Sequence, residues 1–272
     1  MITGKKILVT GGAGSVGSEL VRQLYKDNVC FVFDNNETAL FDLIEELEVE
    51  GRLGDVRDID TVREVFKLYE PNYVFHAAAL KHVTPSMKVP REYVQTNLIG
   101  TLNVLDTAAT HLVEKIINIS SDKAVQSENV MGWSKKGTEL FTRIYGGISV
   151  RFGNVLGSRG SVIPIWQKQI DEGRALTVTD AKAERFMMTI EEAVGLVIEA
   201  AERGQSGDIF ILDLDKKRVN VLELAKEIIK GRDIPIEIIG LRPGEALSES
   251  LMTDHERTIA RKEGGFFILG SG

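Results

Sequence analysis

The chain has 272 residues, of which 43% are hydrophobic and 27% are charged. Its length is roughly 1.8 times the ~150 residues expected of one domain, so we expect one large domain or a main domain with a smaller partner. The composition is ordinary for a globular protein. It excludes a disordered chain, a collagen-like chain and a small disulfide scaffold.

Acidic residues outnumber basic ones, with 33 Lys and Arg against 40 Asp and Glu and a formal net charge of −7. A chain of this charge repels nucleic acid and anionic membrane surfaces, so we expect neither as a partner. The single cysteine, Cys30, cannot form an internal disulfide, which favours a reducing compartment. No apolar run approaches the ~18 residues of a membrane span, and no signal peptide is recognisable. The sequence therefore predicts a cytoplasmic protein.

Short apolar runs alternate with longer amphipathic runs through the first half of the chain, as in a parallel sheet with crossover helices. The predicted strands are residues 5–9, 29–34, 51–54, 73–76, 115–120 and 148–152. The predicted helices between them are residues 15–26, 60–69, 90–111 and 131–145. Because buried parallel strands are continuously apolar, we predict an α/β fold with a doubly wound parallel sheet.

The pattern loosens after residue 152 into loops that contain Gly and Ser, followed by predicted helices at 163–172, 190–203 and 221–230. We expect the sheet domain to span residues 1–154, with residues 190–214 returning to it. Residues 155–272 are expected to form a smaller C-terminal lobe that binds the substrate.

A glycine-rich turn follows the first predicted strand and opens the first predicted helix. Gly11 allows a tight turn, Gly14 lets the backbone approach a pyrophosphate, and Gly17 lets the helix pack closely. Ser15 and Val16 begin the helix, whose N–H groups and partial positive charge favour an anion. A strand before the turn and a helix after it favour a dinucleotide site over a glycine turn without a ligand.

Asp34 ends the second predicted strand, where a carboxylate accepts hydrogen bonds from an adenosine ribose. Its charge repels a 2′-phosphate, and residues 35–37 include no Arg to bind one. The sequence therefore favours NAD over NADP as the cofactor. Two further segments at strand ends are candidate cofactor contacts, Asp55 with Val56 and the run Ala77, Ala78 and Ala79. The small alanine side chains are equally consistent with close packing.

Reactive side chains follow the predicted strand 115–120. Ser121, Asp122 and Lys123 stand at its carboxyl end, where chemistry collects in open α/β sheets. Met131 and Lys135 are four residues apart and share one face of the next helix. The position at a strand end favours chemistry for Asp122 and Lys123 over a solvated surface ion pair.

Several segments resemble the extended short-chain dehydrogenase/reductases, and specifically the nucleotide-sugar 4,6-dehydratases of polysaccharide biosynthesis. The first of these segments, TGxxGxxG, marks only the superfamily. The later combination of SSDKA, RFGNVLGSRGSV and RPGE resembles the UDP-N-acetylglucosamine 4,6-dehydratases closely. The segments occur in the family's order and span nearly the whole chain: TGGAGSVGSEL, GDVRD, HAAALKHV, SSDKAV, MGWSK, RFGNVLGSRGSVIP, ERFMMTIEEAV and LRPGE.

The resemblance implies a Rossmann fold, NAD, and a reaction in which the sugar is oxidised at C4, loses water across C5 and C6, and regains the hydride at C6. It implies that Asp122 is the acid at C6, Lys123 the base at C5, and Lys135 the residue that holds the nicotinamide ribose. Met131 replaces the superfamily's tyrosine and has no ionisable proton. We therefore expect Asp122, with Ser121 orienting the hydroxyl or a water, to deprotonate the C4 hydroxyl.

The resemblance also implies a UDP-sugar partner and a homodimer or higher homo-oligomer. Arginine gives a diphosphate bidentate contacts, and Arg242 with Glu245 pairs a cation with a carboxylate suited to a ribose diol. The full set of expected substrate-binding residues is Lys81, Asn154, Arg159, Val162, Arg185, Arg242 and Glu245.

Other functions remain open from the sequence. A UDP-sugar 4-epimerase also oxidises C4 but needs no acid at C6, and a catalytically inactive protein that binds NAD or a nucleotide sugar would explain Met131. His76 is expected to be a satisfied core residue. Because the histidines and the cysteine show no metal-ligand spacing, we expect no metal.

Overall fold

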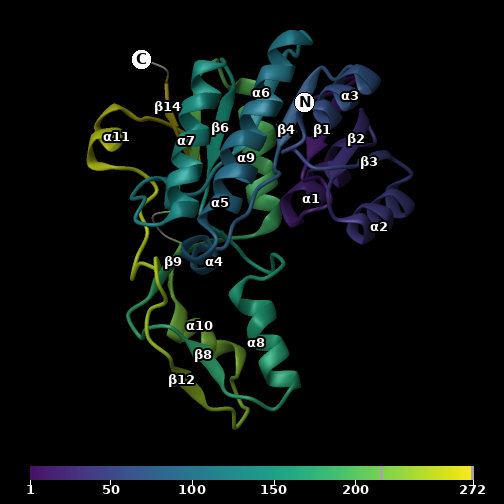
Figure 1. Cartoon of the computed structure of the whole chain (residues 1–272). Helices are drawn as coiled ribbons and strands as arrows, with labels where there is room; N and C mark the ends of the chain where they lie inside the picture. Colours follow the sequence, from purple (N-terminus) through teal and green to yellow (C-terminus); the bar gives the residue numbers. More distant parts are fainter. Residues whose placement is uncertain (215–216, 271–272) are drawn as a thin grey trace.

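The computed structural model describes residues 1–214 and 217–270 as an open sheet covered by helices, with a smaller lobe extending from one end (Figure 1). Residues 215–216 and 271–272, which the sequence analysis assigned to the lobe, lie outside the described residues. Within the described residues the sheet has nine strands. They are β1 (Lys6–Thr10), β2 (Val29–Asp34), β3 (Glu50–Leu53), β4 (Tyr73–His76), β5 (Lys115–Ile119), β6 (Ile148–Arg151), β10 (Ile209–Leu212), β13 (Arg261–Glu263) and β14 (Phe266–Leu269).

The strand order is β13-β14-β10-β6-β5-β4-β1-β2-β3. Every neighbouring pair from β3 across to β10 is parallel, whereas β14 pairs antiparallel with both β10 and β13. This is the doubly wound parallel sheet of a Rossmann fold, as predicted. All six strands predicted for the first half are confirmed, with ends that differ by no more than one residue.

Helices cover both faces of the sheet, because its parallel strands carry apolar side chains on both sides. One core lies beneath α1, α2 and α9, and the other lies beneath α3 and α6. The helices around the sheet are α1 (Ser15–Leu24), α2 (Glu37–Leu47), α3 (Ile59–Tyr69), α4 (Val83–Lys88), α5 (Pro90–Tyr93), the π-helix η1 (Val94–Ile99), α6 (Gly100–Thr110), α7 (Val130–Ile144) and α9 (Ile190–Arg203).

Helix α2 is not among the helices predicted from the sequence. Its residues Leu40 and Leu43 are buried on one face, and the Asn36 side chain caps its first turn by accepting a hydrogen bond from the Ala39 N–H. The polar run before it was interpreted only as part of a cofactor site. Asn36 both caps α2 and lines the cavity at the end of β2, so the two roles are compatible.

The lobe is smaller than the sequence analysis proposed. Strands β13 and β14 fall within the range 155–272, yet they extend the main sheet beyond β10. Antiparallel strands need no crossover helix between them. The sequence therefore lacks the alternation of strand and helix that indicates the other strands.

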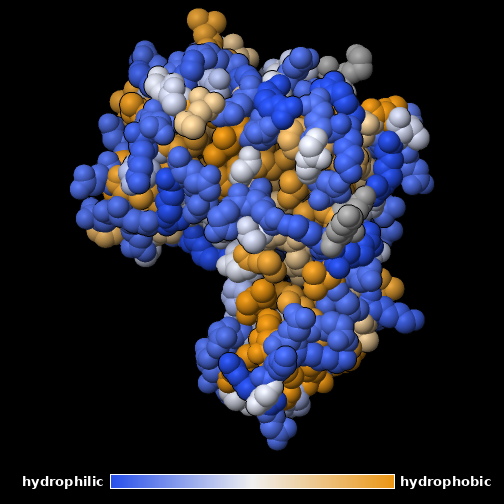
Figure 2. Space-filling view, turned by 180° about the vertical axis from the view of Figure 1, so that it is seen from behind, coloured by the Kyte–Doolittle hydropathy of each residue, from blue (hydrophilic) through white to orange (hydrophobic). Residues whose placement is uncertain are grey.

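The smaller lobe has its own apolar core of Trp166, Leu176, Val178, Ala183, Val221 and Ala225. It is built from α8 (Val162–Asp171), β8 (Leu176–Val178), α10 (Val221–Ile228) and β12 (Ile236–Ile238). A three-stranded sheet of β7 (Asn154–Val155), β9 (Glu184–Met188) and β11 (Arg218–Asn220) lies between this lobe and the main sheet. Figure 2 shows apolar residues gathered where the lobe joins the main body. None of the helices in the described parts of the chain is both long enough and apolar enough to cross a bilayer.

Arg151, at the end of β6, is completely buried and donates five hydrogen bonds. Two go to Glu139 of α7, two to Glu256 of α11 (Asp254–Ile259), and one to the backbone carbonyl of Leu251. Glu139 also accepts a 2.6 Å bond from Ser120, next to the reactive segment. One guanidinium therefore joins β6, α7, α11 and the end of β5.

Replacing Glu256 by Gln is expected to lower the free energy of unfolding at neutral pH by ~1–3 kcal/mol, because a buried cation loses an ionised partner. Burial raises the pKa of Glu256, but the hydrogen bonds and charge of Arg151 outweigh burial and lower it from 4.5 to about 2. A carboxylate whose pKa is lower in the folded protein stabilises the fold at pH values above its ordinary pKa of 4.5. The advantage of wild type over Glu256→Gln should therefore shrink as pH falls from 4.5 towards about 2.

Urea titrations at a series of pH values measure this difference. The matched control is Glu223→Gln, which removes an exposed carboxylate paired with Lys226 and should change stability by less than ~0.5 kcal/mol. Equal effects of the two substitutions would contradict the assigned importance of the Arg151 cluster.

Candidate active site

The predicted cofactor residues come together at the carboxyl ends of β1, β2 and β4, where they line a cavity of about 360 Å³. The cavity wall includes Gly11, Gly14, Asp34, Asp55, Val56, Ala77, Ala78 and Ala79. Ser15, Val16 and Gly17 belong to helix α1 directly beyond the glycine turn. A groove that crosses the ends of these strands fits a dinucleotide in the manner of doubly wound folds.

Two glycines of the turn are required by close backbone contacts. Gly11 has a φ of +65°, and a Cβ there would lie 2.5 Å from the backbone nitrogen of Ala78. A Cβ on Gly17 would lie 2.3 Å from the carbonyl oxygen of Gly11. Gly17 therefore packs α1 against the turn itself, and any side chain at these two positions would push the helix N-terminus out of place.

Asp34 braces the glycine turn and also lines the cavity. One carboxylate oxygen accepts a 2.9 Å hydrogen bond from the backbone N–H of Ala13, and the other accepts from that of Asn36. Each carboxylate oxygen has a second lone pair, so the residue can still accept from a ribose hydroxyl. The geometry fits a cofactor with a free 2′-hydroxyl.

Asp55 is held by the side chain of Arg57, whose Nη2 lies 2.7 Å from its carboxylate. Burial raises the pKa of Asp55, but hydrogen bonds from Arg57 and Asn35 outweigh it, so the pKa is lowered overall. The carboxylate therefore stays ionised in the wall of this cavity.

Arg159, predicted to bind the substrate, contacts the glycine turn. Its side chain donates to the carbonyl of Ala13, and its backbone N–H donates to Ser15 Oγ at 3.1 Å, so it lines the dinucleotide cavity. The loop after β7 folds back onto the glycine turn, a contact that spacing alone does not reveal. Nearby, Lys81 donates to Ser158 at 3.3 Å. Burial and the charge of Arg159 lower the pKa of Lys81.

Asp122 and Lys123 form a buried ion pair at the end of β5. Asp122 Oδ1 accepts from both Lys123 Nζ and Ser121 Oγ at 2.9 Å. The Asp122 side chain is 0% exposed and that of Lys123 is 15% exposed. The second oxygen of Asp122 is buried and has no hydrogen-bond partner among the described residues. Because buried polar atoms of folded proteins nearly always have a partner, this oxygen is a candidate contact for a bound molecule.

Asn154 and Glu249 complete the surroundings of Lys123. The ammonium donates to Asn154 Oδ1 at 3.0 Å, and Glu249 lies 3.9 Å away. Asn154 is among the residues predicted from the sequence, whereas Glu249 is not. The signal that the sequence lacked was burial, because Glu249 follows RPGE by only a few residues and belongs to no motif of its own.

Lys135 and Met131 are both buried on the inner face of α7. Lys135 Nζ donates to the backbone carbonyl of Ile119 at 2.7 Å. Burial lowers the pKa of Lys135 to about 8, and Glu139 opposes the shift. Burial and the charge of Lys135 lower the pKa of His76 to about 3. The ring of His76 is bonded on both sides by threonines, which confirms it as a satisfied core residue.

The remaining predicted residues lie further from this centre. Arg185 is committed to the backbone, because it donates to the carbonyls of Glu184, Ala246 and Leu247. Arg242 is exposed, and its backbone N–H donates to the carboxylate of Glu245 at 3.2 Å. Val162 packs against the core of the smaller lobe.

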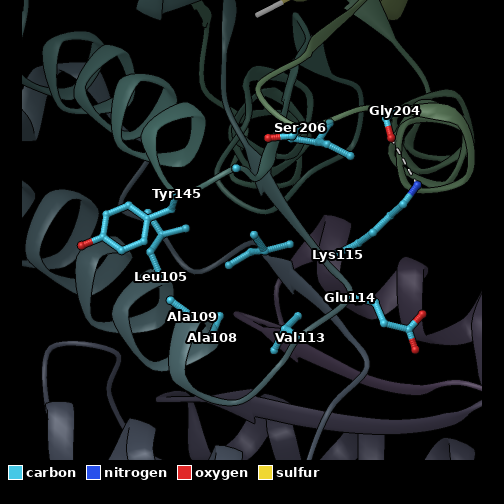
Figure 3. A pocket seen from close by; sticks show the side chains of 12 residues that line it. Leu105, Ala108, Ala109, Val113, Glu114, Lys115, Tyr145, Gly204 and Ser206 are labelled. Carbon is cyan, nitrogen blue, oxygen red and sulfur yellow. Dashed lines mark hydrogen bonds between the residues drawn. The ribbon is translucent and has the colours of Figure 1, made fainter.

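A second cavity of about 190 Å³ opens at the amino ends of β5 and β6, away from all of these residues (Figure 3). Its lysine, Lys115, already donates to the carbonyls of Ala201 and Gly204 at the end of α9. The lysine acts as a helix C-cap, so this cavity adds no catalytic group.

A Rossmann sheet with a glycine turn, an acidic strand end and a buried lysine on α7 defines an extended short-chain dehydrogenase/reductase. The family model described as "Polysaccharide biosynthesis protein" matches residues 7–269. The chain belongs to this family. It is also similar to a capsular polysaccharide biosynthesis protein, CapD of Staphylococcus aureus, and to UDP-glucose 4-epimerases.

Curated relatives are similar over nearly the whole of this chain. An uncharacterized membrane protein of Methanocaldococcus jannaschii is 46% identical over 93% of this chain and 81% of its own length. The probable polysaccharide biosynthesis protein EpsC of Bacillus subtilis is 41% identical over 94% of this chain, which spans only 46% of EpsC. A UDP-glucose 4-epimerase of Rickettsia typhi is 34% identical over 99% of this chain and 84% of its own length.

Among solved structures, Pen from Bacillus thuringiensis superposes with a TM-score of 0.94 at 36% identity. The match covers 98% of this chain and 87% of Pen. The whole arrangement of sheet and lobe is therefore shared with that protein.

The substitution Gly17→Ala is expected to weaken NAD binding at least ~10-fold, because a Cβ there displaces the N-terminus of α1 by overpacking. Isothermal titration with NAD measures the affinity, and the thermal midpoint reports the accompanying strain. Gly195→Ala is the matched control, since Gly195 is also helical but no atom lies within 4 Å of its added Cβ. It should stabilise α9 by up to ~1 kcal/mol and leave NAD affinity unchanged. Equal NAD affinity in both variants would contradict the assignment.

Proposed function

We propose that the chain is an NAD-dependent nucleotide-sugar 4,6-dehydratase that converts a UDP-N-acetylhexosamine, UDP-N-acetylglucosamine above all, to a 4-keto-6-deoxy sugar. The observation that carries the proposal is the buried Asp122–Lys123 pair at the carboxyl end of β5. Elimination of water needs one group that removes a proton from C5 and another that protonates the C6 hydroxyl. An adjacent carboxylate and amine supply both.

NAD, when bound, accepts a hydride from C4 of the sugar and returns it to C6. In this proposal the glycine turn and the N-terminus of α1 hold its pyrophosphate, and Asp34 holds the adenosine ribose. Lys135 holds the nicotinamide ribose. Its lowered pKa, about 8, limits the positive charge that this position places beside the site.

Asp122 moves the proton of the C4 hydroxyl. Its unpartnered oxygen accepts that proton as C4 is oxidised, and the resulting carboxylic acid then protonates the departing C6 hydroxyl. Ser121 holds the other oxygen, so the carboxylate keeps its orientation. This route requires no tyrosine, which is consistent with a buried Met131 at the superfamily's usual position.

Lys123 removes the C5 proton once the C4 ketone has acidified it. Its ammonium must first lose a proton, and Asn154 keeps the amine beside the sugar. The nucleoside diphosphate is held by cations of the loops: Lys81 and Arg159 near the cavity, and Arg242 with Glu245 at the rim. Arg185 and Val162 support this binding surface by positioning the loop at 246–247 and the start of α8.

A UDP-sugar 4-epimerase is the second candidate, favoured by the Rickettsia typhi relative of that name. Epimerisation also begins with C4 oxidation, but it ends with hydride return to the other face of C4. It needs neither an acid at C6 nor a base at C5, so it uses Asp122 only at the C4 hydroxyl and gives the buried Lys123 no role.

Incubation of the protein with UDP-N-acetylglucosamine and NAD in heavy water is expected to yield a sugar with a C6 methyl group and deuterium at C5. Mass spectrometry and proton NMR detect both changes. Asp122→Asn should lower turnover by ~10²–10⁴-fold, because it removes the proton-transfer group. The control Asp180→Asn changes a carboxylate in the smaller lobe and should retain full turnover. Recovery of only the C4 epimer would establish the epimerase and contradict the dehydratase.

We also propose a homodimer formed through the outer face of α7. Trp133, Leu140 and Ile144 are spaced along one side of this helix and are more than half exposed, and Ile99 of η1 is 45% exposed. Helix α7 packs against η1 in the fold. An apolar stripe of this size on a charged protein favours burial against a second copy.

The double substitution Leu140→Glu, Ile144→Glu is expected to convert the dimer to a monomer, because it places like charges opposite one another in the contact. Sedimentation equilibrium measures the mass. Ile238→Glu is the matched control, since Ile238 is 50% exposed on the smaller lobe. A wild-type protein that sediments as a monomer at all concentrations would contradict the proposal.

A further inference from the structure

Glu249 is a buried carboxylate that the steps described above leave without a role. Its side chain is 9% exposed, and its Oε1 lies 3.9 Å from Lys123 Nζ. It approaches Lys123 from the C-terminal part of the chain, whereas Asp122 approaches along the end of β5. The ammonium therefore lies between two carboxylates and the amide oxygen of Asn154.

The position of Glu249 is built by the backbone around it. Arg185 donates to the carbonyls of Ala246 and Leu247, and the N–H of Glu184 donates to Leu247 at 2.8 Å. At the other end of the same loop, Asn129 donates to the carbonyl of Gly244 at 3.1 Å. The loop is thus fastened to β9 and to the start of α7, which holds Glu249 against Lys123.

The charges around Glu249 favour an easily protonated carboxylate. Burial raises its pKa, and the neighbouring carboxylates of Asp122 and Glu128 raise it further, whereas Lys123 and Arg185 lower it. The net direction is upward. One ammonium shared by two buried carboxylates leaves one of them ready to accept a proton.

The proposed function creates a need for such an acceptor. Lys123 must be a neutral amine when it attacks the C5 proton, yet its side chain is only 15% exposed to water that could take its proton. Asp122 cannot serve at that moment, because it already carries the proton from the C4 hydroxyl. Glu249 is the remaining carboxylate within 4.0 Å of Lys123 among the described residues.

We propose that Glu249 accepts the extra proton of Lys123 before elimination and returns it afterwards. This inference rests on the proposed dehydratase function. One N–H bond of the Lys123 ammonium breaks, its electron pair stays on nitrogen, and an O–H bond forms on Glu249. Lys123 then takes the C5 proton, gives one back to C5 after hydride return, and recovers its own from Glu249. The 3.9 Å separation is closed by a small side-chain rotation or by one bridging water.

Glu249 acts through Lys123 and does not touch the sugar, so its removal should separate the two halves of the reaction. In Glu249→Gln, C4 oxidation proceeds while elimination slows, and reduced nicotinamide accumulates, which its near-ultraviolet absorbance reports. We expect kcat to fall ~10–10²-fold near neutral pH with little change in KM. Glu249→Asp keeps a carboxylate and should recover part of the rate.

The pH profile provides a signature that a merely structural role would not produce. Wild-type kcat should fall at acidic pH, where Glu249 is already protonated and cannot accept. In Glu249→Gln the fall that protonation of Glu249 causes should be absent, and kcat should instead rise continuously with pH and with added buffer base, because solvent base must then take the proton of Lys123. Glu128→Gln removes an exposed nearby carboxylate and should leave the wild-type profile nearly unchanged.

A second measurement needs neither substrate nor cofactor. Carbon NMR of labelled glutamate carboxyls follows the titration of Glu249, and Lys123→Met should raise its pKa, since Lys123 lowers it in the native protein. An unchanged Glu249 titration, or a folded Glu249→Gln with wild-type kcat and pH profile, would overturn the inference. Wild-type protein that neither reduces NAD nor dehydrates the sugar would overturn the proposed function instead, while the NMR titration still decides whether Glu249 and Lys123 are coupled.

Discussion

The arrangement of the whole site depends on the hydrogen bonds of one buried guanidinium. Arg151 uses all five of its N–H groups, and its partners belong to α7, α11 and the segment before α11. Through Glu139 and Ser120 the same cluster reaches the end of β5, immediately before Asp122. Burying these charges costs desolvation energy that their attraction only partly offsets. The cluster joins the helix that carries Lys135 to the strand that leads to Asp122, and so it constrains how these two elements lie against each other.

The sequence was sufficient for the parallel half of the fold and insufficient for its edges. Apolar strands that alternate with amphipathic helices form a parallel sheet with helices on both faces. The ends of β1 to β6 were therefore predicted to within one residue. Helix α2 was missed because its capping Asn36 lies in a polar run that also suits the cofactor site. The hairpin of β13 and β14 was missed because its partner, β10, is remote in sequence and no local periodicity encodes that pairing.

The same distinction holds for the site. Asp122, Lys123 and Asn154 follow strands, and strand ends converge, so their meeting follows from the topology. Arg159 and Glu249 sit on long loops whose paths are decided by backbone hydrogen bonds to distant elements. Sequence spacing therefore predicts which residues share a sheet edge. It does not predict which loop folds over that edge, and the charge environment of Lys123 is completed by such a loop.

The Arg151 cluster also has a consequence for biosynthesis. Glu256 lies 105 residues beyond Arg151, and β14 follows it to complete the sheet beside β10. During translation, β1 to β6, α7 and β10 are therefore made before Arg151 has two of its acceptors, Leu251 and Glu256, and before β14 pairs with the edge of β10. A nascent chain at this stage exposes Arg151, which is buried in the folded protein, and the unpaired edge of β10. Both favour non-native pairing. We expect its productive folding to wait for residues 251–269, so that proteins without a native α11 accumulate as aggregates rather than as a partly active enzyme.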